Sequence, residues 1–172
     1  MEMEGNLNMK RRFGSFIILV LGMAAVPALL SAEGPPALDG VWSAVVAPAV
    51  CGSFINIPGA PTFRGLYMFS HDGSLTNEAA FPAAFEPPAI LQRSSGVGAW
   101  RHAQAQTYTG SFRFYRYNSD NSFRALRVVT TTIVLAGDHF FSQDMFQDFD
   151  LDNHPVSPAV TGCNTVVGTR VP

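Results

Sequence analysis

From about residue 35 onward, hydrophobic and polar residues alternate in short runs, and turn-forming residues separate the runs. Alternation with a period of two is typical of β-strands that bury one face. No segment in this part of the chain repeats its apolar residues with the period of a helix. The expected strands cover residues 38–47, 63–69, 74–78, 98–102, 107–117, 123–135, 140–149 and 162–170. Their number and their mostly short connections predict an all-β fold of about eight antiparallel strands, either a sandwich or an up-and-down barrel.

Two segments illustrate the pattern. Asp72-Gly73 separates two of the runs, and Asp-Gly between strands is a strong hairpin signal.

In the strand 107–117, Tyr108, Phe112 and Phe114 share one face, while arginine and tyrosine dominate the other. Arginine and tyrosine keep their polar tips in water while their stems cover apolar surface, so this strand is expected to be half-buried. The alternative, a platform that stacks nucleic-acid bases, would need a basic groove as well.

The first 32 residues differ from the rest. Lys10, Arg11 and Arg12 precede an apolar run, and the small residues Ser31-Ala32 follow it. This order is typical of a secretory signal peptide. The alternative, a membrane anchor, is disfavoured because the uninterrupted apolar core, 16–26, is shorter than the roughly 20 residues that a span needs. We predict a signal peptide at 1–32, a single domain at 33–172, secretion or export to the periplasm, and no stable membrane span after cleavage.

The charge of the exported part argues against a nucleic-acid partner. Residues 33–172 retain eight arginines and eleven acidic residues, which gives a net charge of −3 with neutral histidines. Affinity for nucleic acid depends mostly on neutralising phosphates, and an acidic domain offers little of that.

The two cysteines, Cys51 and Cys163, both lie in the exported part, where disulfides persist. We predict that they are bonded to each other; the alternative is two buried free thiols. Closing so long a loop contributes about 4–5 kcal/mol at most by chain entropy. Cys51 follows the first expected strand and Cys163 begins the last. Their bond would bring the two terminal strands together, which favours a closed barrel over a sandwich.

Two short motifs carry a family resemblance. The first strand contains Gly40-Val41-Trp42, and Arg170 stands near the end of the last strand. In these features the chain resembles the lipocalin-like (calycin) group of secreted barrels, specifically an uncharacterised bacterial branch with that architecture. The resemblance implies that Arg170 packs across Trp42 as a structural plug at the closed end of the barrel. Residues 135–139 depart from the motif that the group usually carries after its sixth strand.

The expected function is binding of a small apolar or amphipathic molecule. Barrels of eight strands hold either side chains alone or one small ligand. The segment 77–97 is long for a connection and is expected to act as a lid, although its apolar residues can equally cap the core. The residues expected to contact the ligand are Trp42, Phe81, Phe85, Tyr108, Phe112 and Phe114.

Two other functions stay open. One is an isomerase or cyclase that acts on an apolar substrate in a barrel of allene-oxide-cyclase-like architecture, with Arg64 or Arg127 paired to Glu78. The other is an envelope interaction module with a packed interior and exposed aromatic residues such as Tyr115 and Tyr117. An enzyme is the less favoured interpretation, because the sequence contains no Gly-x-Ser-x-Gly elbow and no free thiol once the disulfide forms.

No metal or cofactor is predicted. The four histidines outside the signal segment stand in or beside expected turns, without metal-binding spacing. The segment 148–153 is similar to the start of a calcium loop, but Asn153 replaces the required glycine and Ala159 the closing glutamate. We therefore interpret Asp144, Asp148 and Asp150, which share one face of their strand, as a solvated strand edge.

Overall fold

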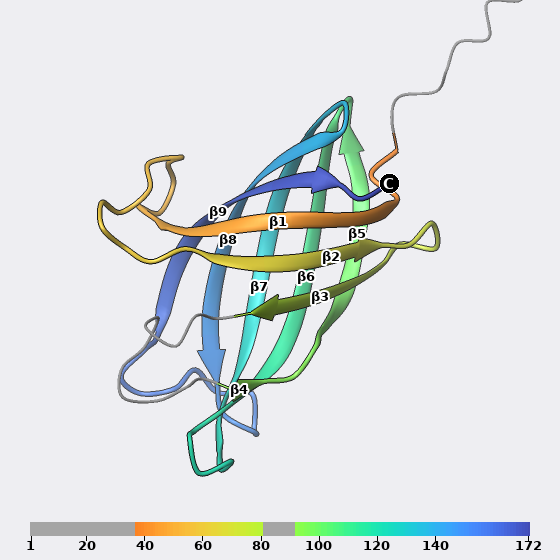
Figure 1. The fold of residues 1–172 in the computed structure, drawn as a ribbon. Helices are drawn as coiled ribbons and strands as arrows, with labels where there is room; N and C mark the ends of the chain where they lie inside the picture. The colour runs from red at the N-terminus through yellow and green to blue at the C-terminus, as the bar shows by residue number, and fades with distance from the viewer. Residues whose placement is uncertain (1–36, 81–91) are drawn as a thin grey trace, which may run out of the picture. The chain divides into compact units, whose positions relative to one another are not determined.

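The computed structural model describes residues 37–80 and 92–172, and this part of the chain is all-β (Figure 1). The predicted signal peptide and most of the predicted lid, with Phe81 and Phe85, lie outside the described residues. The strands are β1 (Gly40–Ala49), β2 (Phe63–Phe69), β3 (Ser74–Ala80), β4 (Gln92–Arg93), β5 (Gly96–Gln104), β6 (Thr107–Tyr117), β7 (Phe123–Ala136), β8 (His139–Phe149) and β9 (Thr161–Arg170).

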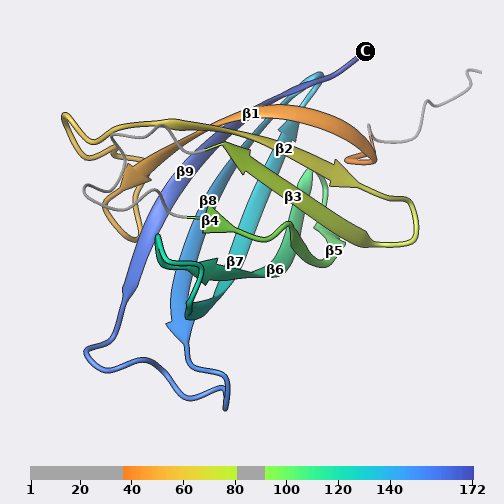
Figure 2. The ribbon, with the colours of Figure 1, turned by 60° about the horizontal axis from the view of Figure 1, so that its bottom comes forward.

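Eight of these strands form a closed, antiparallel, up-and-down barrel, as the sequence predicted. Each pairs with the next along the chain, β6 pairs with β7, and β9 returns to pair with β1. The short strand β4 extends the wall by pairing with the end of β6. In both views of the ribbon, β9 and β1 lie side by side and leave no open edge between the terminal strands (Figures 1 and 2).

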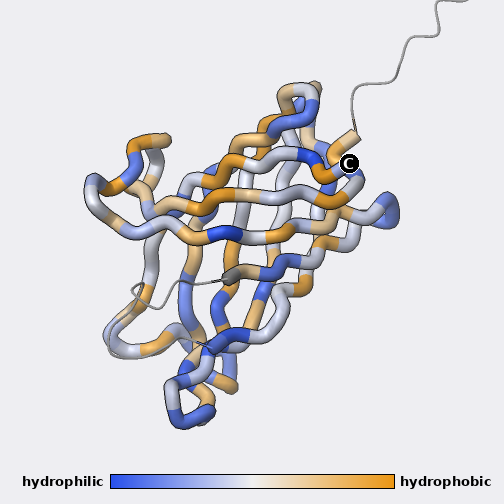
Figure 3. The backbone as a smooth tube through the Cα atoms, viewed as in Figure 1, coloured by the Kyte–Doolittle hydropathy of each residue, from blue (hydrophilic) through white to orange (hydrophobic). Residues whose placement is uncertain are grey.

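The alternation in the sequence corresponds to the inside and outside of this barrel. The colours of Figure 3 change from residue to residue along the strands, as expected for walls with one dry and one wet face. On β6, Tyr108, Phe112 and Phe114 are buried, whereas Arg113 and Tyr115 are exposed. The strand therefore has the half-buried character that its sequence indicated.

One end of the barrel is filled with hydrophobic side chains. Leu38 and Trp42 are fully buried there, and the Trp42 indole donates a hydrogen bond of 2.9 Å to the Leu38 carbonyl. Phe140 packs edge-on against Trp42, with ring centroids 5.3 Å apart. Arg170 covers this end, because its guanidinium carbon lies 4.3 Å from the Trp42 ring centroid and its Nη2 donates to the Ala37 carbonyl at 2.8 Å. The contact implied by the lipocalin resemblance is present.

The disulfide lies at the seam between the first and last strands. Cys51 and Cys163 are bonded, their Cα atoms lie 5.1 Å apart, and Ala49 is the register partner of Cys163. The loop after β1 folds onto the outer wall here, where Asn56 accepts a hydrogen bond from the Thr165 hydroxyl. The disulfide therefore fixes both this loop and the barrel seam.

Candidate ligand-binding site

The other end of the barrel contains a cavity of about 340 Å³. Inward-facing residues of most strands line it, and the loops after β1 and before β9 contribute Ile57 and Val160. The lining combines an aromatic and aliphatic wall with a small number of polar groups, which is the usual composition of a ligand site.

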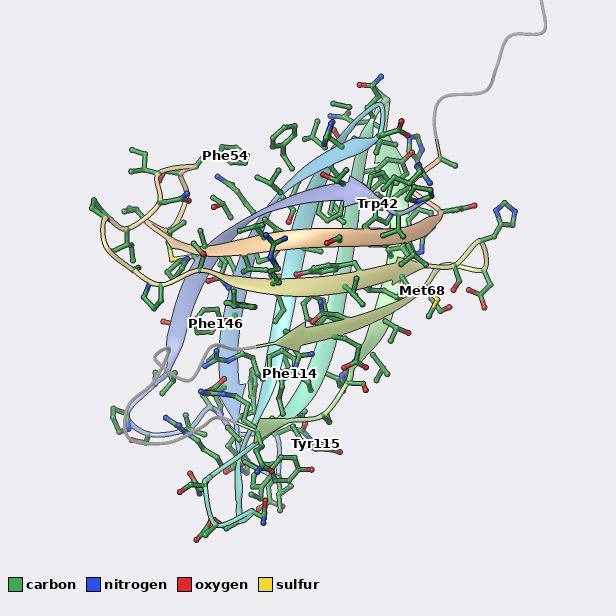
Figure 4. All side chains as sticks on the ribbon, in the orientation of Figure 1. Trp42, Phe54, Met68, Phe114, Tyr115 and Phe146 are labelled. Atoms are coloured by element: carbon green, nitrogen blue, oxygen red, sulfur yellow. A yellow bond between two sulfur atoms is a disulfide. The ribbon has the colours of Figure 1, made fainter. Side chains whose placement is uncertain are left out.

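Aromatic rings form much of the wall. Phe112 and Phe114 stack on neighbouring inward positions of β6, with centroids 6.2 Å apart. Phe146 enters from β8, and Figure 4 shows Phe114 and Phe146 inside the barrel, away from Trp42. Tyr67 separates the cavity from the packed end, because its ring contacts both Phe112 and Phe140, at centroid distances of 6.1 and 5.9 Å.

The Tyr67 phenol is a polar group at the boundary between the cavity and the packed end. Tyr67 is buried and is hydrogen-bonded to the side chain of Asn77. Burial raises the pKa of Tyr67 well above its usual value, and the nearby Asp144 carboxylate acts in the same direction. The phenol therefore stays protonated at neutral pH and can act as a hydrogen-bond donor.

Asp144 projects inward from β8 and is 3 % exposed. It accepts hydrogen bonds from the hydroxyls of Ser142, at 2.9 Å, and of Thr131. These neutral partners only partly offset desolvation, so burial raises the pKa of Asp144 to about 6. Among the described residues, no arginine, lysine or histidine forms an ion pair with this carboxylate. Asp144 is therefore a cavity-lining acid that changes charge close to neutral pH.

Asp148, four residues further along β8, has the opposite environment. Arg127 binds it through Nε at 2.6 Å and Nη2 at 3.0 Å, and Arg116 donates to it at 2.5 Å. Burial alone would raise the pKa of Asp148, but the hydrogen bonds and charges of the two arginines outweigh it and lower the pKa. The Arg127 guanidinium also lies 3.9 Å from the centroid of the Phe146 ring, which holds it against the cavity wall.

Arg93, on β4, provides a second guanidinium that lines the cavity, beside that of Arg127. It lies over the Phe114 ring at 3.6 Å and donates to the carbonyls of Ser94 and Asn77, at 2.9 and 3.1 Å. Burial, assisted by the charge of Arg127, lowers the pKa of Arg93 to about 10, so it remains cationic at neutral pH.

The residues predicted to contact a ligand occupy different parts of the barrel. Phe112 and Phe114 line the cavity. Trp42 and Tyr108 are buried in the hydrophobic core but do not line it. Tyr115, named as a possible interaction residue, is on the outer face and 46 % exposed. The ligand-contact prediction therefore coincides with the cavity wall at two aromatic positions of β6.

Two interpretations of acidic residues were wrong. Asp144 and Asp148 do share a face of β8, but this face points into the barrel, and both residues are buried rather than solvated. Arg127 pairs with Asp148 and not with Glu78, because Glu78 alternates onto the outer face of β3. Arg64 is exposed on the outside as well. The sequence showed which positions share a face, but not that the polar face was the interior one.

Two negative predictions concern metal sites. His71, His102, His139 and His154 are all exposed, although His102 and His139 lie near strand ends, on β5 and β8, rather than in turns. Asp150, Asp152 and His154 place their donor atoms within 4.8 Å of one another, but they lie in an exposed turn where the Asp150 carboxylate already accepts two backbone amides. Asp148, the first position of the apparent calcium loop, is engaged by arginines instead.

A larger hollow of about 560 Å³ lies mainly on the outer wall, over β5 to β9. Its lining is dominated by small outward-facing residues such as Ser111, Thr130 and Thr132. Polar side chains are numerous in this lining, and Asp144 borders it as well as the interior cavity. A hollow on the outer wall buries less of a ligand than an enclosed one, so the interior cavity is the better candidate for a ligand site.

Within residues 37–80 and 92–172, no helix has the length and apolar character needed to cross a membrane.

Comparison with known proteins finds no family model that matches the chain and no curated protein that is similar to it in sequence. The established classification is therefore that of the fold: an all-β chain forming a closed, eight-stranded, antiparallel barrel with one packed end and one hollow end.

Proposed function

We propose that this protein is an exported, lipocalin-like barrel that binds one small amphipathic molecule in its interior. The single observation that carries the proposal is the 340 Å³ cavity at one end of the barrel, which has aromatic walls and buried polar groups. Burying an apolar ligand against these rings is favourable by roughly 25 cal/mol per Å² of apolar surface removed from water. The polar groups would fix the orientation of the ligand.

The cavity volume limits the size of the ligand. At roughly 30 Å³ per water molecule, 340 Å³ corresponds to the space of about eleven waters. A medium-chain aliphatic molecule or a single ring with a short side chain fits this limit. A sterol or a long-chain lipid would need part of its length outside the cavity.

The test is native mass spectrometry of the protein purified from its source, with residues 1–32 removed. A copurified molecule of this size, released by denaturation, would support the proposal. A matched variant, Phe112→Trp, should reduce its occupancy by filling the cavity, whereas Tyr115→Trp on the outer face should not. A clean apo mass, together with no binding of medium-chain amphipaths to the refolded protein, would reject it.

A second candidate function, proton transfer to a bound substrate, is favoured by one specific feature. Asp144 lines the cavity, and its pKa of about 6 lets it both hold and release a proton near neutral pH. The adjacent Tyr67 phenol can donate a hydrogen bond to a developing oxyanion. An isomerase that moves a proton next to a carbonyl group would need such an arrangement.

This candidate can be tested without the natural substrate. Medium-chain ketones and enones would be incubated with the protein in D₂O, and exchange of their α-hydrogens would be followed by mass spectrometry. Exchange that is faster with the wild type than with the Asp144→Asn variant would support an acid–base function. Equal rates for both proteins across the panel would leave ligand binding as the only proposed function.

A further inference from the structure

We propose that the cavity selects a ligand bearing a carboxylate, and that Arg93 is the residue that binds this anionic group. The inference rests on the proposed ligand-binding function and specifies the chemical class of the ligand. It follows from the ion pairing of Arg93, which differs from that of Arg127, the other arginine that lines the cavity.

Within the described part of the chain, Arg93 is in ion-pair contact with no carboxylate, although the charge of Glu78 acts on it from a greater distance. Arg127 is ion-paired with Asp148 through two hydrogen bonds, and it shares this carboxylate with Arg116. Arg93, by contrast, forms no ion pair with any described residue, and its partners are two neutral carbonyls and the face of the Phe114 ring. A guanidinium that is partly withdrawn from water without an anion is costly, and a bound carboxylate would relieve this cost.

The geometry of Arg93 leaves donors available to a ligand. A guanidinium has five N–H groups, and the two hydrogen bonds of Arg93 use one on Nε and one on Nη2. Its Nη1 makes no hydrogen bond to a described residue. Every buried side-chain nitrogen of the described residues does have a hydrogen-bond partner, so Nη1 is not among the buried ones. Nη1 is therefore accessible, and since Arg93 lines the cavity, this donor can face a molecule held there.

The acidic residue of the cavity would orient such a ligand. Asp144 repels a carboxylate, whereas Arg93 attracts it, and both residues line the cavity. A ligand carboxylate is favoured on the Arg93 side, and its apolar body then lies against Phe112, Phe114 and Phe146. Contact of Arg93 with the Phe114 ring also limits its rotation, so that less side-chain entropy is lost on binding.

The experiment compares decanoate with decan-1-ol, two probes that have the same apolar chain and differ in the terminal group. Binding would be measured by isothermal titration calorimetry at about pH 8, where a carboxylic acid is ionised. We expect the wild type to bind decanoate about 10- to 100-fold more tightly than decan-1-ol, since charge-assisted hydrogen bonds are among the stronger ones. Arg93→Gln should abolish this preference while keeping the affinity for decan-1-ol. Arg93→Lys should retain part of it, and the exposed control Arg101→Gln should leave it unchanged.

The outcomes separate the two proposals. Equal affinity for both probes in the wild type and in Arg93→Gln would overturn the carboxylate inference but leave ligand binding in place. If Arg93→Gln and Arg93→Lys both failed to bind either probe, Arg93 would have a structural role, and the carboxylate inference would also be overturned. Failure of the wild type to bind either probe would count against the proposed function itself.

Discussion

Replacing Asp144 by asparagine should stabilise the folded protein, and the gain should grow with pH. The carboxyl group is buried and has neutral hydrogen-bond partners, so the ionised form is less stable in the barrel than in the unfolded chain. Asparagine has nearly the same shape and can still accept hydrogen bonds from Ser142 and Thr131. The variant would thus remove a buried charge without opening a void.

The magnitude follows from the linkage between pKa and stability. The pKa of Asp144 rises from 3.8 to about 6 on folding, and each pKa unit is worth about 1.4 kcal/mol. Because the folded pKa is the higher one, the unfolded chain releases this proton at lower pH than the folded chain does. The stability contributed by the protonated carboxyl is present below about pH 4 and is lost as pH rises through about 6. The loss amounts to about 2–3 kcal/mol between about pH 4 and about pH 8.

The assay is denaturant unfolding of the disulfide-intact protein, followed by tryptophan fluorescence from about pH 4 to about pH 8. The quantity of interest is the free energy of unfolding of Asp144→Asn minus that of the wild type. Other titrating groups, such as Asp148 and His71, are common to both proteins and cancel to a first approximation. This difference should rise with pH, whereas the matched difference for the exposed control Asp152→Asn should stay flat. A flat difference for Asp144→Asn as well would refute the claim that burial raises the pKa of this carboxyl.

Two further substitutions test the seam and the closed end of the barrel. Replacing Cys51 and Cys163 together by serine should lower the free energy of unfolding by about 2–5 kcal/mol, measured by denaturant unfolding, and added reductant should then have no further effect on the variant. A wild type as stable with reductant as without it would contradict this. Arg170→Met should cost about 1–3 kcal/mol and alter the near-UV circular dichroism of Trp42, because it removes a cation over the indole and hydrogen bonds to two carbonyls. An unchanged spectrum and melting temperature, equal to those of the exposed control Arg101→Met, would show that Arg170 does not support this end.

The barrel itself was predictable because its signals are local. Alternation of polar and apolar residues specifies which side chains share a face, and Asp72-Gly73 specifies a turn between two such runs. The pairing of two cysteines needed no further information, and their positions next to the first and last strands indicated closure. Differences at strand ends are small: β3 continues to Ala80, two residues beyond the predicted strand.

The polar part of the cavity was not predictable, because its signals are not local. Both faces of β8 are mixed: Phe140, Ser142 and Asp144 point inward, while Phe141 and Met145 point outward and are exposed. Periodicity alone cannot decide which of two mixed faces is interior. The partners of the buried charges also come from other strands, as with Asp148 and Arg116, which are 32 positions apart in the sequence.

The distribution of polar groups inside the barrel bears on the choice between a ligand-binding protein and an envelope module with a packed interior. At the closed end, Leu38, Trp42 and Phe140 fill the space between the strands, and the arginine over them is paired with backbone carbonyls. At the hollow end, Asp144 and Arg93 occupy positions where apolar side chains would give a more stable barrel, because buried ions that lack a well-matched partner are a net cost. A fold that needed only a solid interior would have no reason to place these costs around its cavity. Their concentration there favours the proposed ligand-binding function over a purely structural one, because in that proposal the groups that cost stability are the ones that would contact the ligand.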